Sequence, residues 1–220
     1  MQDLLIFVSK GVSILASKAR ENGQKTVAAD KFVFEALFST ITNANFDKDA
    51  IIAKVKEGFE VRDALKLQLE NAGVELNGLH SSTSWMSTDE AEMERKSNLV
   101  GVLETGNEDI RSLRELVIYG LKGMAAYAEH AYNLNQTNDE VFAFIHNALR
   151  ATTEEHTVDE LVALVLETGK FGVDVMALLD KANTDAYGNP EITEVNIGVK
   201  NNPAILISGH DLKDFEELLA

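Results

Sequence analysis

The chain has 220 residues, of which 45% are hydrophobic and 25% charged, as expected for a globular protein with one large domain or two small ones. Its 36 acidic and 20 basic residues give a net charge of −16, which disfavours binding to nucleic acid or to an anionic membrane because like charges repel. It contains no cysteine, which excludes disulfides, thiol nucleophiles and any iron–sulfur cluster held by cysteines of this chain alone.

A helix is predicted at the start of the chain. Its apolar residues recur every three to four positions and so share one face: they are Leu4, Val8, Val12, Leu15 and Ala19. Gly23 provides a stop signal. The segment lacks the basic start of a signal peptide, and no apolar run approaches the roughly 18 residues of a membrane span. We therefore expect a cytoplasmic protein that binds no membrane.

Two more helices are predicted before an irregular region. The first carries an apolar stripe between Phe34 and Ile41, and the second begins at Asp47 or Asp49 and runs to about Glu70. Residues 71–88 have no helical period and are rich in Asn, Gly and Ser, which indicates a long surface connection. Within it, we expect Trp85 to pack on a neighbouring helix. A short polar helix, roughly Asp89 to Ser97, follows.

A strong apolar period predicts a helix from about Glu108 to Leu134. Gly120 and Gly123 lie inside it, and we expect close packing at both, because a glycine in a helix costs up to ~1 kcal/mol. Asn138 or Asp139 caps the next helix. The sequence Thr157-Val158-Asp159-Glu160 is a capping box that starts a helix running to about Ala182.

The sequence changes character after Asn183. Residues 187–190 form a turn signal, residues 195–199 and 205–207 have strand composition, and Asp211 caps a last helix. Two short strands are marginal by themselves. The predicted fold class is therefore mainly α. Residues 1–185 form an all-α domain of helix bundles, and residues 186–220 are the first strands and helix of a truncated α/β (Rossmann-like) domain.

One histidine has a suggestive position. His210 follows the apolar strand that ends at Ile207, and α/β sheets bind ligands at the carboxyl ends of their strands. Taken alone, these residues fit a structural role equally well, and Asp211 fits a helix cap better than a catalytic acid. A mononuclear metal site of His210 and Asp211 lacks a third ligand.

The remaining four histidines are scattered, and we assign them no function: they are His80, His130, His146 and His156. The sequence has no Glu-x-x-His pair, no His-Glu-x-x-His and no Gly-x-Gly-x-x-Gly.

Several long segments resemble the hybrid-cluster protein family, also called prismane proteins or hydroxylamine reductases. The resemblance lies in residues 38–47, 120–128, 159–172, 183–184, 187–193, 195–199 and 205–212. It covers essentially the whole chain and is weakest between residues 60 and 105. Several ordered matches of this length are far more specific than a single motif.

The resemblance implies a helical N-terminal domain followed by two α/β domains. It implies a cysteine-bound [4Fe-4S] cluster near the N-terminus and a hybrid iron–sulfur–oxygen cluster where the three domains meet. The implied activity is the reduction of hydroxylamine to ammonia, with electrons from a separate donor. Nitric oxide is another substrate proposed for the family. His210 matches a hybrid-cluster ligand, so it is the cofactor-binding and metal-binding residue assigned here. No catalytic residue is assigned.

The chain also departs from the family pattern. The four-cysteine segment would precede Gln2, and the other two glutamate and four cysteine ligands of the hybrid cluster would follow Ala220. One imidazole cannot hold a multi-iron cluster, because thiolates and carboxylates supply most of the coordination. We therefore expect this chain alone to bind neither cluster and to be inactive, with the missing α/β domains as its partners.

The alternative is a non-catalytic acidic helical module that binds a protein partner. The disposition of residues 192–220 discriminates between the two. A complete module should pack these residues onto its helices, whereas a fragment should leave apolar surface exposed.

Overall fold

The computed structural model describes residues 1–41, 47–207 and 211–220. Over these ranges it is mainly helical and contains no strand, so the mainly α prediction is confirmed. The α-helices are α1 (Gln2–Glu21), α2 (Val27–Ser39), α3 (Lys48–Asn71), α4 (Glu90–Ser97), α5 (Glu108–Asn133), α6 (Asp139–Ala151), α7 (Val158–Tyr187) and α8 (Leu212–Leu219). Two short 3₁₀ helices are η1 (Ser81–Thr83) and η2 (Val102–Glu104). Among the described helices, none combines the length and apolar character needed to cross a membrane.

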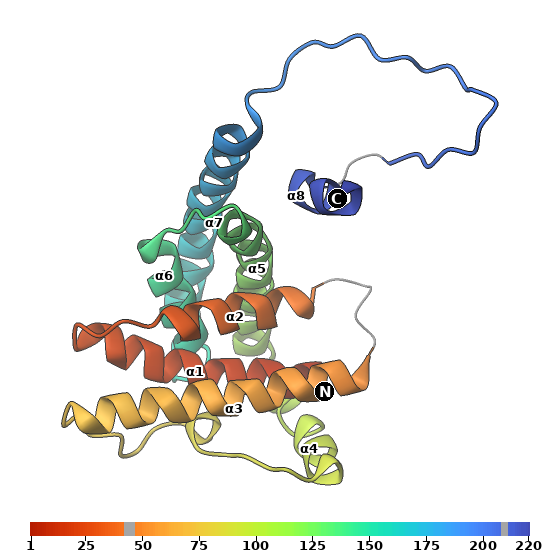
Figure 1. Cartoon of the computed structure of the whole chain (residues 1–220). Helices are drawn as coiled ribbons and strands as arrows, with labels where there is room; N and C mark the ends of the chain where they lie inside the picture. Colours follow the sequence, from red (N-terminus) through yellow and green to blue (C-terminus); the bar gives the residue numbers. More distant parts are fainter. Residues whose placement is uncertain (42–46, 208–210) are drawn as a thin grey trace.

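The helices form two groups that cross each other. Figure 1 shows α1, α2 and α3 lying side by side across the body, with α5 and α7 crossing them at a large angle. Helix α1 contacts α2, α3 and α6, and α2 contacts α5. Leu5, Val8 and Leu15 of α1 are fully buried. Because it is covered on nearly every side, α1 is the central helix of the core.

Side-chain caps fix the helix starts where the sequence predicts them. The Asp47 carboxylate accepts the backbone N–H groups of Asp49 at 2.9 Å and Ala50 at 3.2 Å. Thr157 and Glu160 form the complete capping box, with the Thr157 N–H donating to Glu160 Oε2 at 2.8 Å. These bonds satisfy N–H groups that a helix end leaves unpaired. The predicted starts of α3 and α7 are confirmed.

The long connection predicted over residues 71–88 is present and is fixed to the helices beneath it. The Trp85 ring packs on Phe7 and Phe59, with centroids 6.3 and 5.9 Å apart, so its predicted packing on helices is confirmed. Arg62 of α3 is fully buried and donates to the carbonyl oxygens of Ser82 at 3.2 Å and Trp85 at 2.6 Å. The connection is therefore an ordered part of the fold.

The C-terminal part differs from the sequence prediction. Helix α7 continues to Tyr187 instead of ending near Ala182, and Gly188 terminates it with a φ of 82°. Residues 195–199 and 205–207, predicted as strands, are extended segments without strand pairing. Strands require a hydrogen-bonded neighbour, and the described residues supply none here. Figure 1 shows this segment running away from the helices and returning to α8.

The two glycines of α5 also differ from each other. A Cβ added to Gly120 would lie 2.6 Å from Thr168 Cγ2 of α7, so the close packing predicted there is confirmed. A Cβ added to Gly123 would meet nothing within 4 Å, so the same prediction is wrong for Gly123 within this chain.

Candidate functional site

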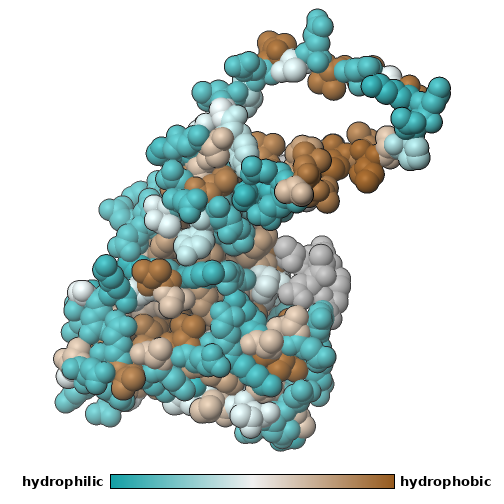
Figure 2. Space-filling view, viewed as in Figure 1, coloured by the Kyte–Doolittle hydropathy of each residue, from teal (hydrophilic) through white to brown (hydrophobic). Residues whose placement is uncertain are grey.

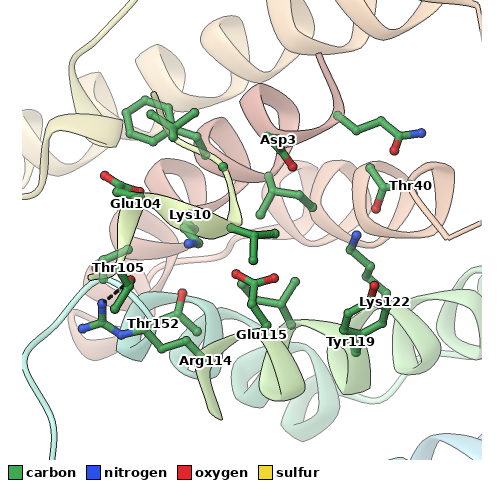
Figure 3. Close-up of a pocket in the computed structure, with 18 of the residues that line it drawn as sticks. Asp3, Lys10, Thr40, Glu104, Thr105, Arg114, Glu115, Tyr119, Lys122 and Thr152 are labelled. Atoms are coloured by element: carbon green, nitrogen blue, oxygen red, sulfur yellow. Dashed lines mark hydrogen bonds between the residues drawn. The ribbon is translucent and has the colours of Figure 1, made fainter. Parts of the chain in front are cut away.

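A polar pocket of about 500 Å³ lies between α1, α5 and the segment around η2 (Figure 3). We call it the Lys10 pocket. Its charged walls are Asp3 and Lys10 of α1, Glu104 of η2, and Arg114, Glu115 and Lys122 of α5. Asp3 and Lys10 are seven positions apart, as are Glu115 and Lys122, and this spacing puts each pair on one side of its helix. Two helices thus present facing pairs of opposite charge.

The Lys10 amine and the Glu115 carboxyl point into this pocket from facing helices (Figure 3). Burial lowers the pKa of Lys10, although Glu115 and Glu104 partly oppose the shift. Burial raises the pKa of Glu115, against the opposing effect of Lys10 and Lys122. Both shifts move the pKa of the group toward neutral pH. The pocket therefore places one amine and one carboxyl group, each with a shifted pKa, against the same polar space.

Arg114 and His80 complete the pocket in different ways. Arg114 Nη1 donates to Thr105 Oγ1 at 3.2 Å, and its buried Nε has no hydrogen-bond partner among the described residues. His80 Nδ1 accepts the Ser82 N–H at 3.3 Å and so caps η1. Burial lowers the pKa of His80. Arg114 Nη2 also donates to the Glu154 carbonyl oxygen, so Arg114 ties α5 to two loops, and the contacts of His80 are those of a structural residue.

The predicted ligand His210 lies outside the described residues, so its position is not part of the structure. Its neighbour Asp211 caps α8 by accepting the Lys213 N–H at 2.8 Å, which confirms the predicted cap. Asp211 Oδ2 also lies 3.7 Å from His130 Nδ1 of α5. The segment that follows His210 therefore starts beside the C-terminal end of α5.

The donor atoms of this chain do not fit a multi-iron cluster. The sequence has no cysteine, and the described residues contain no group of three or more His, Asp or Glu side chains arranged to hold a metal ion. A cluster needs several thiolate or carboxylate ligands.

Sequence reasoning missed a buried polar network around His146. Its Nε2 lies 2.8 Å from Asp30 Oδ1, and its Nδ1 lies 3.0 Å from Ser13 Oγ. Asp30 also accepts a hydrogen bond from Thr26 Oγ1 at 2.8 Å and two from Arg20 Nη2, each of 3.0 Å. The network links α1, α2 and α6 inside the core, so its role is structural. The signal in the sequence is an imidazole on the apolar stripe of Phe142, Ile145 and Leu149.

The Lys10 pocket was missed as well. Lys10 sits in the predicted first helix and Glu115 in the predicted fifth, but no pattern in the sequence shows that the two faces meet. The available signal is that Lys10 lies between the buried residues Val8 and Val12, and that Glu115 lies between Leu113 and the buried Val117.

Comparison with known proteins gives matches over the whole chain. Residues 1–220 match the model of the Prismane/CO dehydrogenase family. The hydroxylamine reductase of Desulfitobacterium hafniense (strain DSM 10664 / DCB-2) is 59% identical over 221 residues, which cover 100% of this chain and 40% of that protein. The hydroxylamine reductase of Clostridium novyi (strain NT) is 57% identical, with the same coverage. That of Clostridium botulinum (strain Langeland / NCTC 10281 / Type F) is 55% identical and covers 99% of this chain and 43% of its own length. The chain thus spans about 40% of the length of these curated relatives.

Proposed function

Because the chain belongs to the Prismane/CO dehydrogenase family, we propose that it is the helical N-terminal part of a hydroxylamine reductase. The observation that carries this proposal is its 55 to 59% identity to such enzymes over essentially its full length. Under this proposal, residues 1–185 are the helical domain and residues 186–220 begin an α/β domain. The reaction would cleave the N–O bond of hydroxylamine with two electrons and two protons, giving ammonia and water.

The exposed C-terminal segment supports the proposal. Several of its large apolar side chains are each at least 75% exposed, namely Ile192, Val195, Ile197, Val199, Ile205 and Leu206. Figure 2 shows hydrophobic patches on the segment that projects from the body. Leaving this much apolar area in water is unfavourable by about 25 cal/mol per Å². Neighbouring strands of a sheet would cover it, which favours this proposal over a self-contained interaction module.

In the proposed enzyme, His210 would be a ligand of the hybrid cluster, as the family resemblance implies. The thiolates for that cluster and for the [4Fe-4S] cluster would come from polypeptide outside these 220 residues, because this sequence has no cysteine. The described helices would pack around the clusters and limit their contact with water. The 220-residue chain would then be inactive without the α/β domains and an electron donor.

The test compares this chain with a longer protein that carries its natural sequence on both sides. Iron, acid-labile sulfide, the visible spectrum and hydroxylamine reduction are measured for both. We expect iron and turnover only in the longer protein. His210→Ala in the longer protein should change the spectrum of the hybrid cluster, while the matched variant His156→Ala should not. Turnover by the 220 residues alone, or an unchanged His210→Ala spectrum, would contradict the proposal.

A further inference from the structure

Helices α5 and α7 share a face that carries exposed apolar side chains. On α5 these residues recur every three or four positions, at Leu116, Tyr119 and Tyr127, and Gly123 falls in the same series. On α7 the series is Val162, Leu166, Gly169, Val173 and Met176. Leu116, Tyr119, Leu166 and Val173 are 53, 66, 71 and 60% exposed. We call these residues, with Gly172, the outer α5–α7 face.

The two series lie on the same side of the helix pair. The helices run parallel, since Gly120 contacts Thr168 and, further along, Gln136 Nε2 donates to Asp185 Oδ2 at 3.3 Å. Viewed along the axis of α5, its buried residues lie to one side of the Gly120–Thr168 contact, the side that packs on α2. The exposed series of α5 lies to the other side of that contact. On α7, Phe171 lies on the side of the helix that packs on α6, where its ring stacks on Phe144. The exposed series of α7 lies on the opposite side. Both series therefore face away from the core.

Three glycines on this face are unexplained by the described contacts. A Cβ added to Gly123, Gly169 or Gly172 would meet nothing within 4 Å. Each glycine costs its helix up to about 1 kcal/mol relative to alanine. Gln136 and Asp185, which are hydrogen-bonded across the two parallel helices, are 49 positions apart in sequence. Gly123 and Gly172 have the same separation, so they lie at the same level along the helix pair. A further backbone or a flat side chain could approach the helices closely at these three positions, because none of them carries a side chain.

The position of the C-terminal segment indicates what covers this face. The chain leaves the C-terminal end of α7 and returns to the same end of the helix pair at α8. There Tyr187 Oη donates to Glu216 Oε2 at 3.1 Å, and Asp211 lies beside His130 of α5. Polypeptide that continues from this point is tethered next to the outer face, which raises its effective concentration there. A second copy is disfavoured, because each copy carries a net charge of −16.

We propose that the outer α5–α7 face is the docking surface for the α/β part that residues 186–220 begin. This inference rests on the proposed function. The apolar series would form the buried centre of the contact, and Gly123, Gly169 and Gly172 would admit a closely packed segment of the α/β part. The curated relatives have the length for such a part, because this chain covers 40% of theirs.

The test is hydroxyl-radical footprinting of the 220-residue chain and of the longer protein. The reporters are Met176 and Tyr127 on the outer face, 46 and 41% exposed here, with Met86, 53% exposed on the connection before α4, as the internal control. We expect oxidation of Met176 and Tyr127 to fall at least fivefold in the longer protein and that of Met86 to stay within twofold. Leu166→Glu in the longer protein should restore oxidation of Met176. The matched variant Leu67→Glu, at a 59% exposed leucine of α3, should not.

The outcomes separate docking from function. If the longer protein reduces hydroxylamine but Met176 and Tyr127 stay as reactive as in the short chain, the docking surface is wrong and the proposed function stands. If both reporters are protected but the longer protein is inactive with its iron loaded, docking stands and the function is wrong. Protection that disappears on dilution would identify a second copy as the occupant and overturn the proposal.

Discussion

Nε2 of His146 lies 2.8 Å from Oδ1 of Asp30, and this contact joins α6 to α2 across 116 positions of sequence. Both side chains are buried, at 1 and 9% exposure. Burial alone would raise the pKa of Asp30, but the hydrogen bonds from His146, Arg20 and Thr26 outweigh it and lower that pKa. The pair therefore holds an ionised carboxylate inside the crossing point of the two helix groups.

Replacing Asp30 should strongly destabilise the fold. Asp30→Asn removes the charge that pairs with half-buried Arg20 and that is hydrogen-bonded to buried His146, and we expect a loss of about 3 kcal/mol in the free energy of unfolding. The matched variant Asp139→Asn breaks the other ion pair of Arg20, whose carboxylate is 85% exposed, and should cost at most about 1 kcal/mol. Urea unfolding of the two variants measures the difference. Equal losses in the free energy of unfolding would show that the buried Asp30 carboxylate stabilises the fold no more than the exposed Asp139 carboxylate does.

The same carboxylate should govern acid unfolding. Its folded-state pKa is lowered from the ordinary value of 3.8, so its stabilising effect is complete above that value and is lost as the pH falls through the folded-state pKa. We expect the stability of the wild type to fall in that range more steeply than that of Asp30→Asn. Urea unfolding at a series of acidic pH values tests this, and parallel curves would rule it out.

Removing the half-buried amine of Lys10 should stabilise the protein. Burial lowers the pKa of Lys10, so its charged form is disfavoured in the fold, and Lys10→Met should add about 1 kcal/mol at neutral pH. In the wild type, stability should rise as the pH increases from the folded-state pKa toward 10.5, because the unfolded chain then binds the extra proton. Lys10→Met should lack this rise.

Lys31→Met provides the control for that experiment, because Lys31 lies on the surface of α2 with its side chain 52% exposed. It should change the free energy of unfolding by less than about 0.5 kcal/mol. If Lys10→Met destabilised the protein instead, attraction to Glu115 and Glu104 would outweigh the desolvation of the amine.

What the sequence predicts well is local. Asp47 and Thr157 cap their helices through bonds that span two or three residues, so a short pattern is enough to find them. The Asp30–His146 pair has no such pattern, because each residue looks ordinary within its own helix. Gly120 and Gly123 show the same limit: their local cost is equal, and only the neighbouring helix distinguishes them. His210 is singled out by its place after the apolar residues 205–207, its ligand role rests on the family resemblance, and it lies outside the described residues.

The buried guanidinium of Arg62 should hold the connection before α4 in place. It donates to the Ser82 and Trp85 carbonyls, and Arg62→Met would leave both without that donor. We expect a loss of about 3 kcal/mol and at least tenfold faster chymotrypsin cleavage at Trp85. Arg95→Met, on the surface of α4 with a side chain 68% exposed, is the matched control. Unchanged cleavage in Arg62→Met would mean that the ring contacts of Trp85 suffice.

A single methyl group at Gly11 should disturb the same connection from the opposite side. A Cβ there would lie 2.1 Å from the Ser82 carbonyl oxygen, a backbone atom that Arg62 already holds, so neither partner can move freely. We expect Gly11→Ala to cost at least 2 kcal/mol, roughly the cost of overpacking a core. Gly169→Ala meets nothing within 4 Å and should instead stabilise the 220-residue chain by up to about 1 kcal/mol, because alanine favours helix. Thermal unfolding of the two variants should therefore shift in opposite directions. A stabilised Gly11→Ala would show that η1 can leave α1 without loss, and that the connection is not part of the core.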